Sequence, residues 1–555
     1  MSLLPIIQGG ASVSGGGLDP DAITNSIWLD GSPDKLTLVL GAKTRTRCVI
    51  GTWVQKTAYP TSSVNATIFS KSNPGSEFSF RMDENGTNGK FTIFDWDGGS
   101  FQYSANTSTM RFKDLWWYHV MMSIDTTASA GSRLKFFVNG IDQTSALNVT
   151  TDYTLNDNPS VTGAQASQWG VGYNGAQFIK CYLAQSFMLD DDSIQNGDVA
   201  ISDLFDEADD RFVPKASSAI AALASSAGGD SFCLDYSNAS DLGNDASSNN
   251  NDFTLNSITS ANQSTNSPSN TYPVMNILDP CNSTRTFSEG NMKVTGSGGS
   301  DGGAIATLPL PTSGTTEFQV KSLNGQGRVG IMAKEECQKV ATAADNAAGG
   351  SAAPYNAGYH YTENGTLRTV LSSGESTTTP FTSFTTNDVI TVRYNADDNE
   401  LNFLKNNVAQ GSTISTVSGL LYWPVVTRFN DYNFQMFFDK DDFPHTIGTG
   451  NQELNSATLA TESFSNPQAF TVKGTGSTNG PNVYFGFTLS TSDAMTINSN
   501  AVTYGTDVEV QGSGVKLIST SSNFNTTGTN TISVVTANAL EINGAKPPPY
   551  GQTNS

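Results

Sequence analysis

The sequence is poor in the residues that carry most catalytic and metal chemistry. Among its 555 residues are three His and five Cys, and charged residues make up only 14% of the chain. The five Cys are scattered, odd in number and in no metal-binding spacing, so they indicate neither a zinc site nor a disulfide framework. They favour assembly in a reducing compartment.

Basic residues are also scarce, with 29 Lys and Arg against 51 Asp and Glu. The resulting net charge of −22 disfavours binding to nucleic acid or to an anionic membrane surface. No apolar run reaches the roughly 20 residues of a membrane-spanning helix, which argues against membrane insertion. The first eight residues have no basic region and too short an apolar core for a signal peptide.

What the sequence does contain is short stretches with a two-residue period. Every second residue from Tyr118 to Ile124 is apolar, which predicts a strand with one face in a core. The pattern repeats over 133–138. Asn139-Gly140 then supplies the positive φ angles that a tight hairpin turn needs.

The same plan recurs far downstream. Residues 389–394 and 400–405 alternate around a polar turn, and Asn406-Asn407 closes the second strand. Two such strand pairs so far apart suggest two separate β-sandwiches rather than one large domain. The Ala-rich stretch 216–224 predicts a short helix.

The predicted fold class is therefore all-β, with tandem antiparallel sandwiches followed by a small C-terminal β-domain. Turn residues and changes in composition divide the chain into six segments. These are a flexible N-terminal anchor peptide (1–17), a first sandwich (18–200), an acidic and polar connector (201–285), a second sandwich (286–450), a small β-domain (465–546) and a tail (547–555).

Parts of the first sandwich and the connector resemble a known family. Residues 50–56, 117–120 and 134–140 are similar to the laminin-G-like, concanavalin-like domains of bacteriophage virion proteins, notably those of marine phages. The polar segment that follows in such proteins gives the most specific likeness, here at 232–237, 242–254, 267–270 and 276–280. The resemblance implies a laminin-G-like jelly roll for the first sandwich.

The resemblance continues into the second half of the chain. Residues 387–390, 401–407 and 422–426 look like a SPRY domain, which implies a SPRY-like second sandwich. Residues 476–481 and 514–518 resemble a C-terminal module of the same virion proteins, abridged here. Each motif is short, and together they cover roughly residues 20–545.

Such proteins are generally taken to be tail fibres or other surface proteins of the particle, so the resemblance implies attachment to the host cell. It implies a homotrimer on the virion, assembled in the host cytoplasm, whose sandwich loops contact host surface glycan or protein. The N-terminal peptide, with Leu3, Leu4, Ile6 and Ile7, would dock onto other virion proteins. The alternative for this peptide is a frayed terminus.

Three other functions stay open. A head fibre or capsid decoration protein would contain the same domains. A polysaccharide depolymerase would need two carboxylates across the scissile bond, and the Glu-x-Asp-x-Glu strand usual in enzymes of this fold is absent. A secreted cellular adhesin would need a signal peptide. We predict no enzymatic activity and no catalytic residues.

The candidate ligand-binding residues are Asp95, Trp96 and Asp97, because paired carboxylates beside an indole can bind sugar or calcium. The alternative is a turn with two solvated carboxylates. The resemblance to laminin-G-like folds makes Ca²⁺ possible at residues 190–192, but three adjacent Asp on a loop are usually just solvated, so no metal or cofactor is predicted. His119 lies on a strand between apolar neighbours, which predicts a structural role.

Overall fold

The computed structural model describes residues 22–41, 45–57, 66–73, 76–83, 90–107, 115–162, 166–172, 175–208, 211–277, 284–297, 302–333, 357–371, 374–428, 431–456 and 458, together with seven strands between 468 and 535. The chain forms two compact units, residues 1–460 and 461–555. In the described residues every pairing between the named strands is antiparallel, which confirms the predicted all-β class. No helix there is long and apolar enough to cross a membrane.

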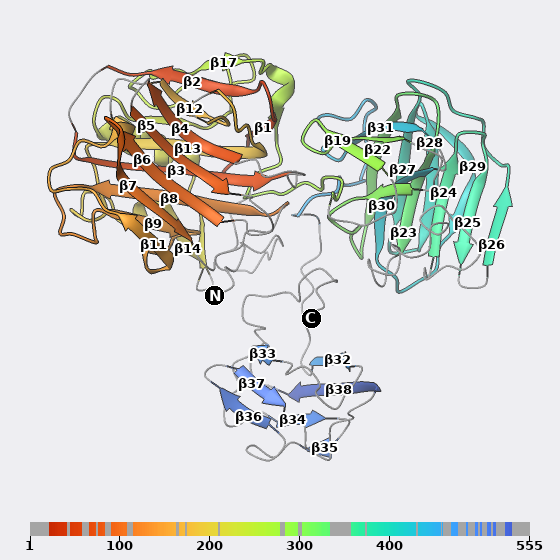
Figure 1. The fold of residues 1–555 in the computed structure, drawn as a ribbon. Coiled ribbons are helices and arrows are strands. Elements are labelled where there is room, and N and C mark those ends of the chain that lie inside the picture. The colour runs from red at the N-terminus through yellow and green to blue at the C-terminus, as the bar shows by residue number, and fades with distance from the viewer. Residues whose placement is uncertain are drawn as a thin grey trace. The chain divides into compact units, whose positions relative to one another are not determined.

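The first sandwich consists of two eight-stranded sheets in stacked layers (Figure 1). One sheet has the order β10-β9-β8-β3-β13-β1-β18, with β16 also on β13. Its strands are β1 (Ser26–Asp30), β3 (Arg47–Lys56), β8 (Trp117–Asp125), β9 (Leu134–Val138), β10 (Ile141–Asp142), β13 (Lys180–Asp190), β16 (Phe232–Leu234) and β18 (Gln263–Ser264).

The facing sheet has the order β11-β7-β6-β5-β4-β12-β2-β17. Its strands are β2 (Lys35–Val39), β4 (Ala66–Asn73), β5 (Ser76–Asp83), β6 (Lys90–Asp97), β7 (Ser100–Thr107), β11 (Leu147–Thr151), β12 (Ala166–Trp169) and β17 (Thr254–Asn256). Three short 3-10 helices lie in the loops: η1 (Thr144–Ala146), η2 (Ser160–Thr162) and η3 (Ser260–Asn262).

The predicted central hairpin is present as β8 and β9, and Asn139 and Gly140 have φ values of 50° and 75°. The predicted core face of β8 is confirmed, because Tyr118, Val120, Met122 and Ile124 face the core between the sheets. The other face, for which the sequence predicts no core, is buried as well, since all nine residues of the strand are buried. The opposite face belongs to a second apolar cluster.

This outer cluster lies on the other side of the first sheet and is covered by residues from further along the chain. It consists of Ile23, Val49, Trp53, Leu115, Trp117, Met121, Phe137, Tyr182, Ala184, Phe187, Leu189, Val199, Leu204, Phe205, Ile220, Ala221, Ala224, Cys233 and Val274. The covering residues come from α1 (Ile201–Leu204), β14 (Phe205–Ala208) and α2 (Ser217–Ser226), and β14 pairs with β15 (Arg211–Pro214). The predicted short helix is thus α2, and it buries Ile220 and Ala224.

Much of the segment predicted as a connector, 201–285, is part of the first sandwich. Its strands β16, β17 and β18 pair with β13, β2 and β1, so they extend both sheets. Phe232, Leu234 and Phe253 are buried in the inner core. The polar residues between them form local turns: Asp245, for example, accepts hydrogen bonds from the backbone N–H groups of Cys233 and Ser247.

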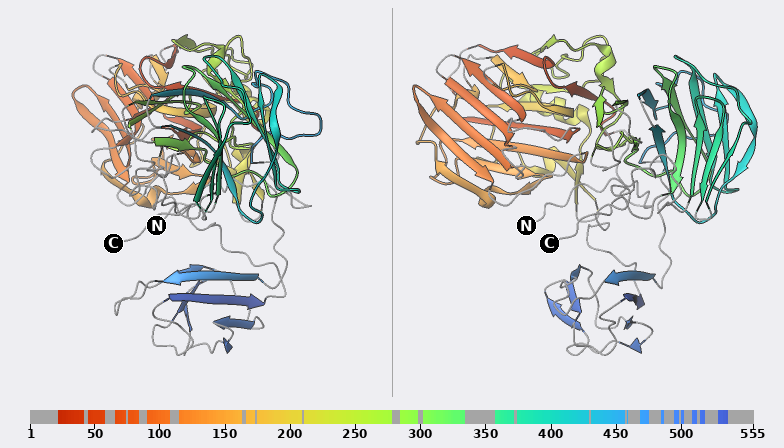
Figure 2. Two further views of the ribbon diagram at one scale, coloured as in Figure 1. Left: turned by 90° about the vertical axis from the view of Figure 1, so that its right-hand side faces the viewer. Right: turned by 45° about the vertical axis from the view of Figure 1, so that its right-hand side comes forward.

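The second sandwich has a seven-stranded sheet of order β19-β20-β31-β22-β27-β28-β29 and a six-stranded sheet of order β21-β30-β23-β24-β25-β26 (Figure 2). The first contains β19 (Thr284–Ser288), β20 (Lys293–Ser297), β22 (Thr315–Ser322), β27 (Val389–Asn395), β28 (Glu400–Lys405), β29 (Val408–Ser415) and β31 (Tyr432–Phe437). The second contains β21 (Gly302–Ile305), β23 (Arg328–Ala333), β24 (Ala357–Thr362), β25 (Leu367–Leu371), β26 (Gly374–Thr378) and β30 (Tyr422–Arg428).

The C-terminal unit contains two small sheets, as expected for a small β-domain. One has the strands β32 (Gln468–Gly474), β34 (Ala494–Ile497), β35 (Asn500–Ala501) and β38 (Gly528–Val535). The other has β33 (Tyr484–Gly486), β36 (Val508–Gln511) and β37 (Gly514–Leu517).

Candidate functional site

The predicted ligand-binding residues lie at the hairpin between β6 and β7. Gly98 and Gly99 form its two-residue turn with φ values of 57° and 93°, in the left-handed region that glycine adopts without strain. This turn sets Asp97 opposite Ser100 and Trp96 opposite Phe101. The hairpin therefore brings together two aromatic residues, of which the sequence analysis named only Trp96.

The turn places both rings on the same face of the sheet, because the side chains of directly opposed residues share a face. Beyond them a β-bulge shifts the register: Asp95 pairs with Tyr103, so that Gln102 is the extra residue. Because side chains alternate along a strand, this extra residue lets Tyr103 face inward while Phe101 faces outward. Bulges often redirect side chains next to functional sites. Here the rings of Trp96 and Phe101 meet edge to face, with centroids 4.8 Å apart.

Three further side chains complete what we call the aromatic patch: Glu77, Arg81, Phe94, Trp96 and Phe101. Phe94 lies 6.0 Å from Phe101 between ring centroids, and the Arg81 guanidinium stands 4.9 Å from the Phe94 ring. Glu77 is the register partner of Trp96, and partial burial raises the pKa of its carboxyl. Phe101 is 46% exposed, so the patch is accessible to a ligand.

Asp95 lies on the opposite side of the sheet and is fully buried. Its Oδ2 accepts hydrogen bonds of 2.9 Å from the Tyr153 hydroxyl and the Ser160 backbone N–H. Burial raises the pKa of Asp95 to about 6. The three predicted residues are therefore separated: Asp95 holds a loop inside the sandwich, Trp96 lies in the patch, and Asp97 is an exposed turn residue that accepts a hydrogen bond from Ser76.

Asp95 belongs to a buried row that the sequence analysis missed. Lys71, Phe78, Asp95 and Tyr103 are register partners across β4, β5, β6 and β7 on the inner face of the sheet. The Lys71 ammonium donates a 2.9 Å hydrogen bond to the carbonyl of Val161, and burial lowers the pKa of Lys71 to about 8. These buried polar groups fix the loop around η2 and are inaccessible to a surface ligand.

Two of the three possible calcium ligands at 190–192 form ion pairs. Asp190 is buried and forms an ion pair with Arg45, which also contacts Asp230 at 2.6 Å. Asp191 is exposed and lies 3.5 Å from Arg47. In the described part of the chain, no group of three or more His, Cys, Asp or Glu is arranged to hold a metal ion.

His119 and a small internal pocket both belong to cores. The His119 ring packs between Trp53 and Phe205, and burial lowers its pKa to about 3.

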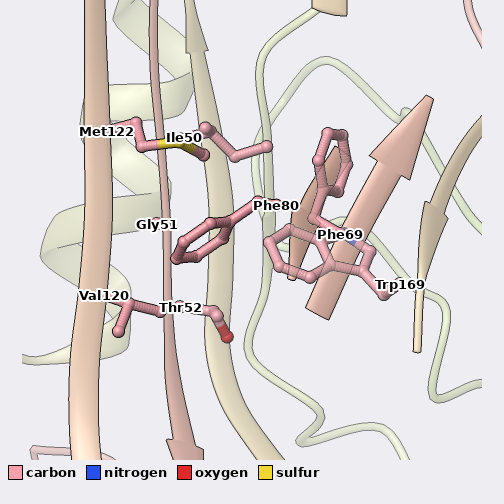
Figure 3. Close-up of a pocket in the computed structure, with 8 residues that line it drawn as sticks. All are labelled: Ile50, Gly51, Thr52, Phe69, Phe80, Val120, Met122 and Trp169. Atoms are coloured by element: carbon pink, nitrogen blue, oxygen red, sulfur yellow. The ribbon is translucent and has the colours of Figure 1, made fainter. Parts of the chain in front are cut away.

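The pocket shown in Figure 3 lies between the two sheets of the first sandwich and is nearly all apolar. It is lined by Ile50, Gly51, Thr52, Phe69, Phe80, Val120, Met122 and Trp169.

The predicted docking residues Leu3, Leu4, Ile6 and Ile7 lie outside the described residues. Of the patch residues that the sequence analysis missed, Phe101 had a usable signal. A two-residue turn that pairs Asp97 with Ser100 also pairs Trp96 with Phe101. The bulge that turns Tyr103 inward has no such signature.

Comparison with known proteins places the patch inside a recognised domain. Residues 34–178 match the family model described as the Concanavalin A-like lectin/glucanases superfamily. The chain therefore contains a concanavalin-like domain in its first sandwich. No curated protein matches the sequence.

Several solved structures resemble part of the chain. The SPRY domain of human HERC1 is 20% identical over 26% of this chain and 87% of its own, with a TM-score of 0.21. The TRIM65 PSpry domain is 10% identical over 30% of this chain and 92% of its own, with a TM-score of 0.24. A heptameric SAP-like pentraxin from Limulus polyphemus is 11% identical over 32% of this chain and 78% of its own, with a TM-score of 0.23.

Proposed function

We propose that this protein is a non-enzymatic attachment protein on the surface of a bacteriophage particle, and that its first sandwich binds host surface glycan through the aromatic patch. The tail-fibre role follows the resemblance of the sequence to virion proteins. The glycan-binding role is supported by the arrangement of the patch, in which the turn of the β6–β7 hairpin sets Phe101 beside Trp96 on an exposed sheet face.

The chemistry of the patch suits a sugar. Aromatic rings offer apolar faces to the C–H groups of a pyranose, while nearby polar groups can bind its hydroxyls and fix its orientation. Glu77 and Arg81 stand on the same face as Trp96 and Phe94. The net charge of −22 disfavours a strongly anionic polysaccharide, so the preferred ligand is a neutral glycan.

Binding rather than hydrolysis is supported by the number of carboxylates. Glycoside hydrolysis ordinarily requires two carboxyl groups about 5–9.5 Å apart across the bond that is cleaved. Glu77 is the one carboxylate of the aromatic patch, because Asp95 is buried on the other face of the sheet. This arrangement favours an adhesive role over a depolymerase.

The test is binding of the purified full-length protein to host cells and to an array of neutral glycans. Trp96→Ala and Phe101→Ala should each weaken binding about tenfold or more, as for central aromatic contacts elsewhere. Leu155→Ala, which truncates a 61% exposed side chain of the same sandwich, is the matched control and should bind normally. A protein lacking residues 1–17 should bind as the full chain does. Unchanged binding in both aromatic variants would contradict the proposed site.

A further inference from the structure

A turn of the second sandwich is held in a strained conformation. Residues 289–292 join β19 to β20, and Glu289, Gly290 and Asn291 have φ values of 53°, 63° and 66° in succession. Positive φ is unfavourable for a residue such as Glu, and it persists only where surrounding contacts impose it. In this turn the first sandwich supplies such contacts.

Gly290 lies directly against Tyr182 of β13. The Tyr182 hydroxyl donates a 2.8 Å hydrogen bond to the carbonyl of Gly290, and both residues are buried. A methyl group on Gly290 would collide with this hydroxyl. Because Tyr182 belongs to the outer cluster of the first sandwich, the turn is docked onto that cluster.

Two further hydrogen bonds fix the turn. The side-chain amide of Asn291, which is 3% exposed, donates to the carbonyl of Thr57 at 2.6 Å. The backbone N–H of Glu289 donates to the Asp30 carboxylate at 3.2 Å. The turn is therefore bonded at the ends of β1 and β3 as well as to β13.

The polar segment 265–277, which follows β18, is bonded to the first sandwich by buried side chains. The side-chain amide of Asn266 donates to the side-chain oxygen of Gln55 at 2.8 Å. The backbone carbonyl of Asn266 accepts a 2.6 Å hydrogen bond from the Ser26 hydroxyl. These three residues are at most 2% exposed, so the bonds are shielded from water.

The later residues of this segment are shared between two cores. Thr307 of the second sandwich donates its backbone N–H to the carbonyl of Val274 at 2.9 Å. Tyr272 and Met275 are buried in the core of the second sandwich, whereas Val274 is buried in the outer cluster of the first. Met292 of the turn packs against both. Separating the two sandwiches would therefore expose apolar surface from both.

We propose that the first and second sandwiches form one rigid and cooperative unit, locked together by the turn 289–292 and the segment 265–277. Domains of one chain move relative to each other by default unless their interface is large and apolar. Here shared apolar residues are combined with buried hydrogen bonds, and a buried polar group that loses its partner is costly. Residues 1–460 accordingly belong to a single compact unit.

This lock goes beyond glycan binding and does not depend on the aromatic patch. Its consequence for attachment rests on the proposed function. A pull on a glycan bound to the first sandwich would be carried directly to the second, with no flexible joint between them.

The test is hydrogen exchange of the full-length protein in increasing urea, followed by mass spectrometry of peptides, which reports on each sandwich separately. In the wild type, peptides that contain β8 and β27 should lose protection at the same urea concentration. Gly330→Ala, whose methyl group collides with the carbonyl of Tyr359 in the second sandwich, should lower both midpoints equally, by about 0.2–0.5 M.

Two backgrounds then test the lock itself. With Gly290→Ala, which forces the turn away from Tyr182, Gly330→Ala should shift the β27 peptides at least twice as far as the β8 peptides. Gly419→Ala is the matched control: Gly419 also has a positive φ, 74°, but a methyl group there meets no atom within 4 Å. In that background the two shifts should stay equal. Circular dichroism would verify that every variant folds.

Two outcomes would overturn the proposal. One is a Gly330→Ala shift that is confined to the β27 peptides in the wild-type background, which would show two independent sandwiches. The other is an equal shift of both peptides in the Gly290→Ala background, which would show that the turn is not the lock. Neither outcome bears on glycan binding, which is measured separately with the Trp96→Ala and Phe101→Ala variants.

Discussion

Asp95→Asn removes a carboxylate that the first sandwich keeps away from water, and its effect on stability should depend on pH. Burial raises the pKa of Asp95 from 3.8 to about 6. The folded and unfolded chains therefore differ by about 2 pKa units, each worth about 1.36 kcal/mol. The ionised carboxylate should destabilise the folded state by about 3 kcal/mol above pH 6.

The sign follows from the raised pKa. The contribution of Asp95 to stability is fully present below pH 4, where the carboxyl is protonated in both states, and is lost as the pH rises to about 6. Asn does not titrate, and the local free-energy change caused by its amide is the same at every pH. The difference in unfolding free energy, variant minus wild type, should therefore increase by about 3 kcal/mol between pH 4 and pH 7.5.

The assay is urea unfolding followed by tryptophan fluorescence at several pH values. Six of the seven Trp (28, 53, 96, 116, 117 and 169) precede residue 200, so the signal reports mainly on the first sandwich. Asp97→Asn removes the same charge at an exposed turn residue and controls for the change in net charge. An equal effect of Asp95→Asn at pH 4 and pH 7.5 would refute the reasoning.

Two further predictions concern buried residues, one in each sandwich. Burial lowers the pKa of Lys71 from 10.5 to about 8, so wild-type stability should rise by about 3 kcal/mol as the pH increases from 8 to 10.5. Lys71→Met should abolish this rise in the same urea experiment, and its persistence would assign the rise to another group. Gly330→Ala places a methyl group against the carbonyl oxygen of Tyr359 on the neighbouring strand and should destabilise the second sandwich by about 1–3 kcal/mol. Calorimetry would test this, and an unchanged melting temperature would contradict it.

The features that the sequence predicted well are those that neighbouring residues determine. The β8–β9 hairpin and the turns at Asn139-Gly140 and Asn406-Asn407 depend on alternation and on residues that tolerate positive φ. Helix α2 likewise follows from its own Ala-rich composition. These are local properties, which a single sequence expresses directly.

The features that it missed depend on contacts between distant residues. The outward face of β8 is buried because α2 and Phe205, which follow about 80 or more positions later, cover it. The sequence predicts Asp95 as a ligand-binding residue, with a solvated turn as the alternative, because its partners Tyr153 and Ser160 are not identifiable from the local pattern. Phe101 and Tyr103 face opposite sides although they are two positions apart, because of a bulge that the alternation of side chains does not anticipate.

The strands β16, β17 and β18 have a consequence for how the protein is made. They complete both sheets of the first sandwich, yet they leave the ribosome after nearly all of its other strands. At about 5–20 residues per second, synthesis of residues 201–264 takes roughly 3–13 seconds, during which β1 and β2 lack their final neighbours. A fragment that ends at residue 200 leaves the edges of β1 and β2 permanently unpaired and is expected to aggregate. A fragment that extends past residue 264 pairs β1 with β18 and β2 with β17.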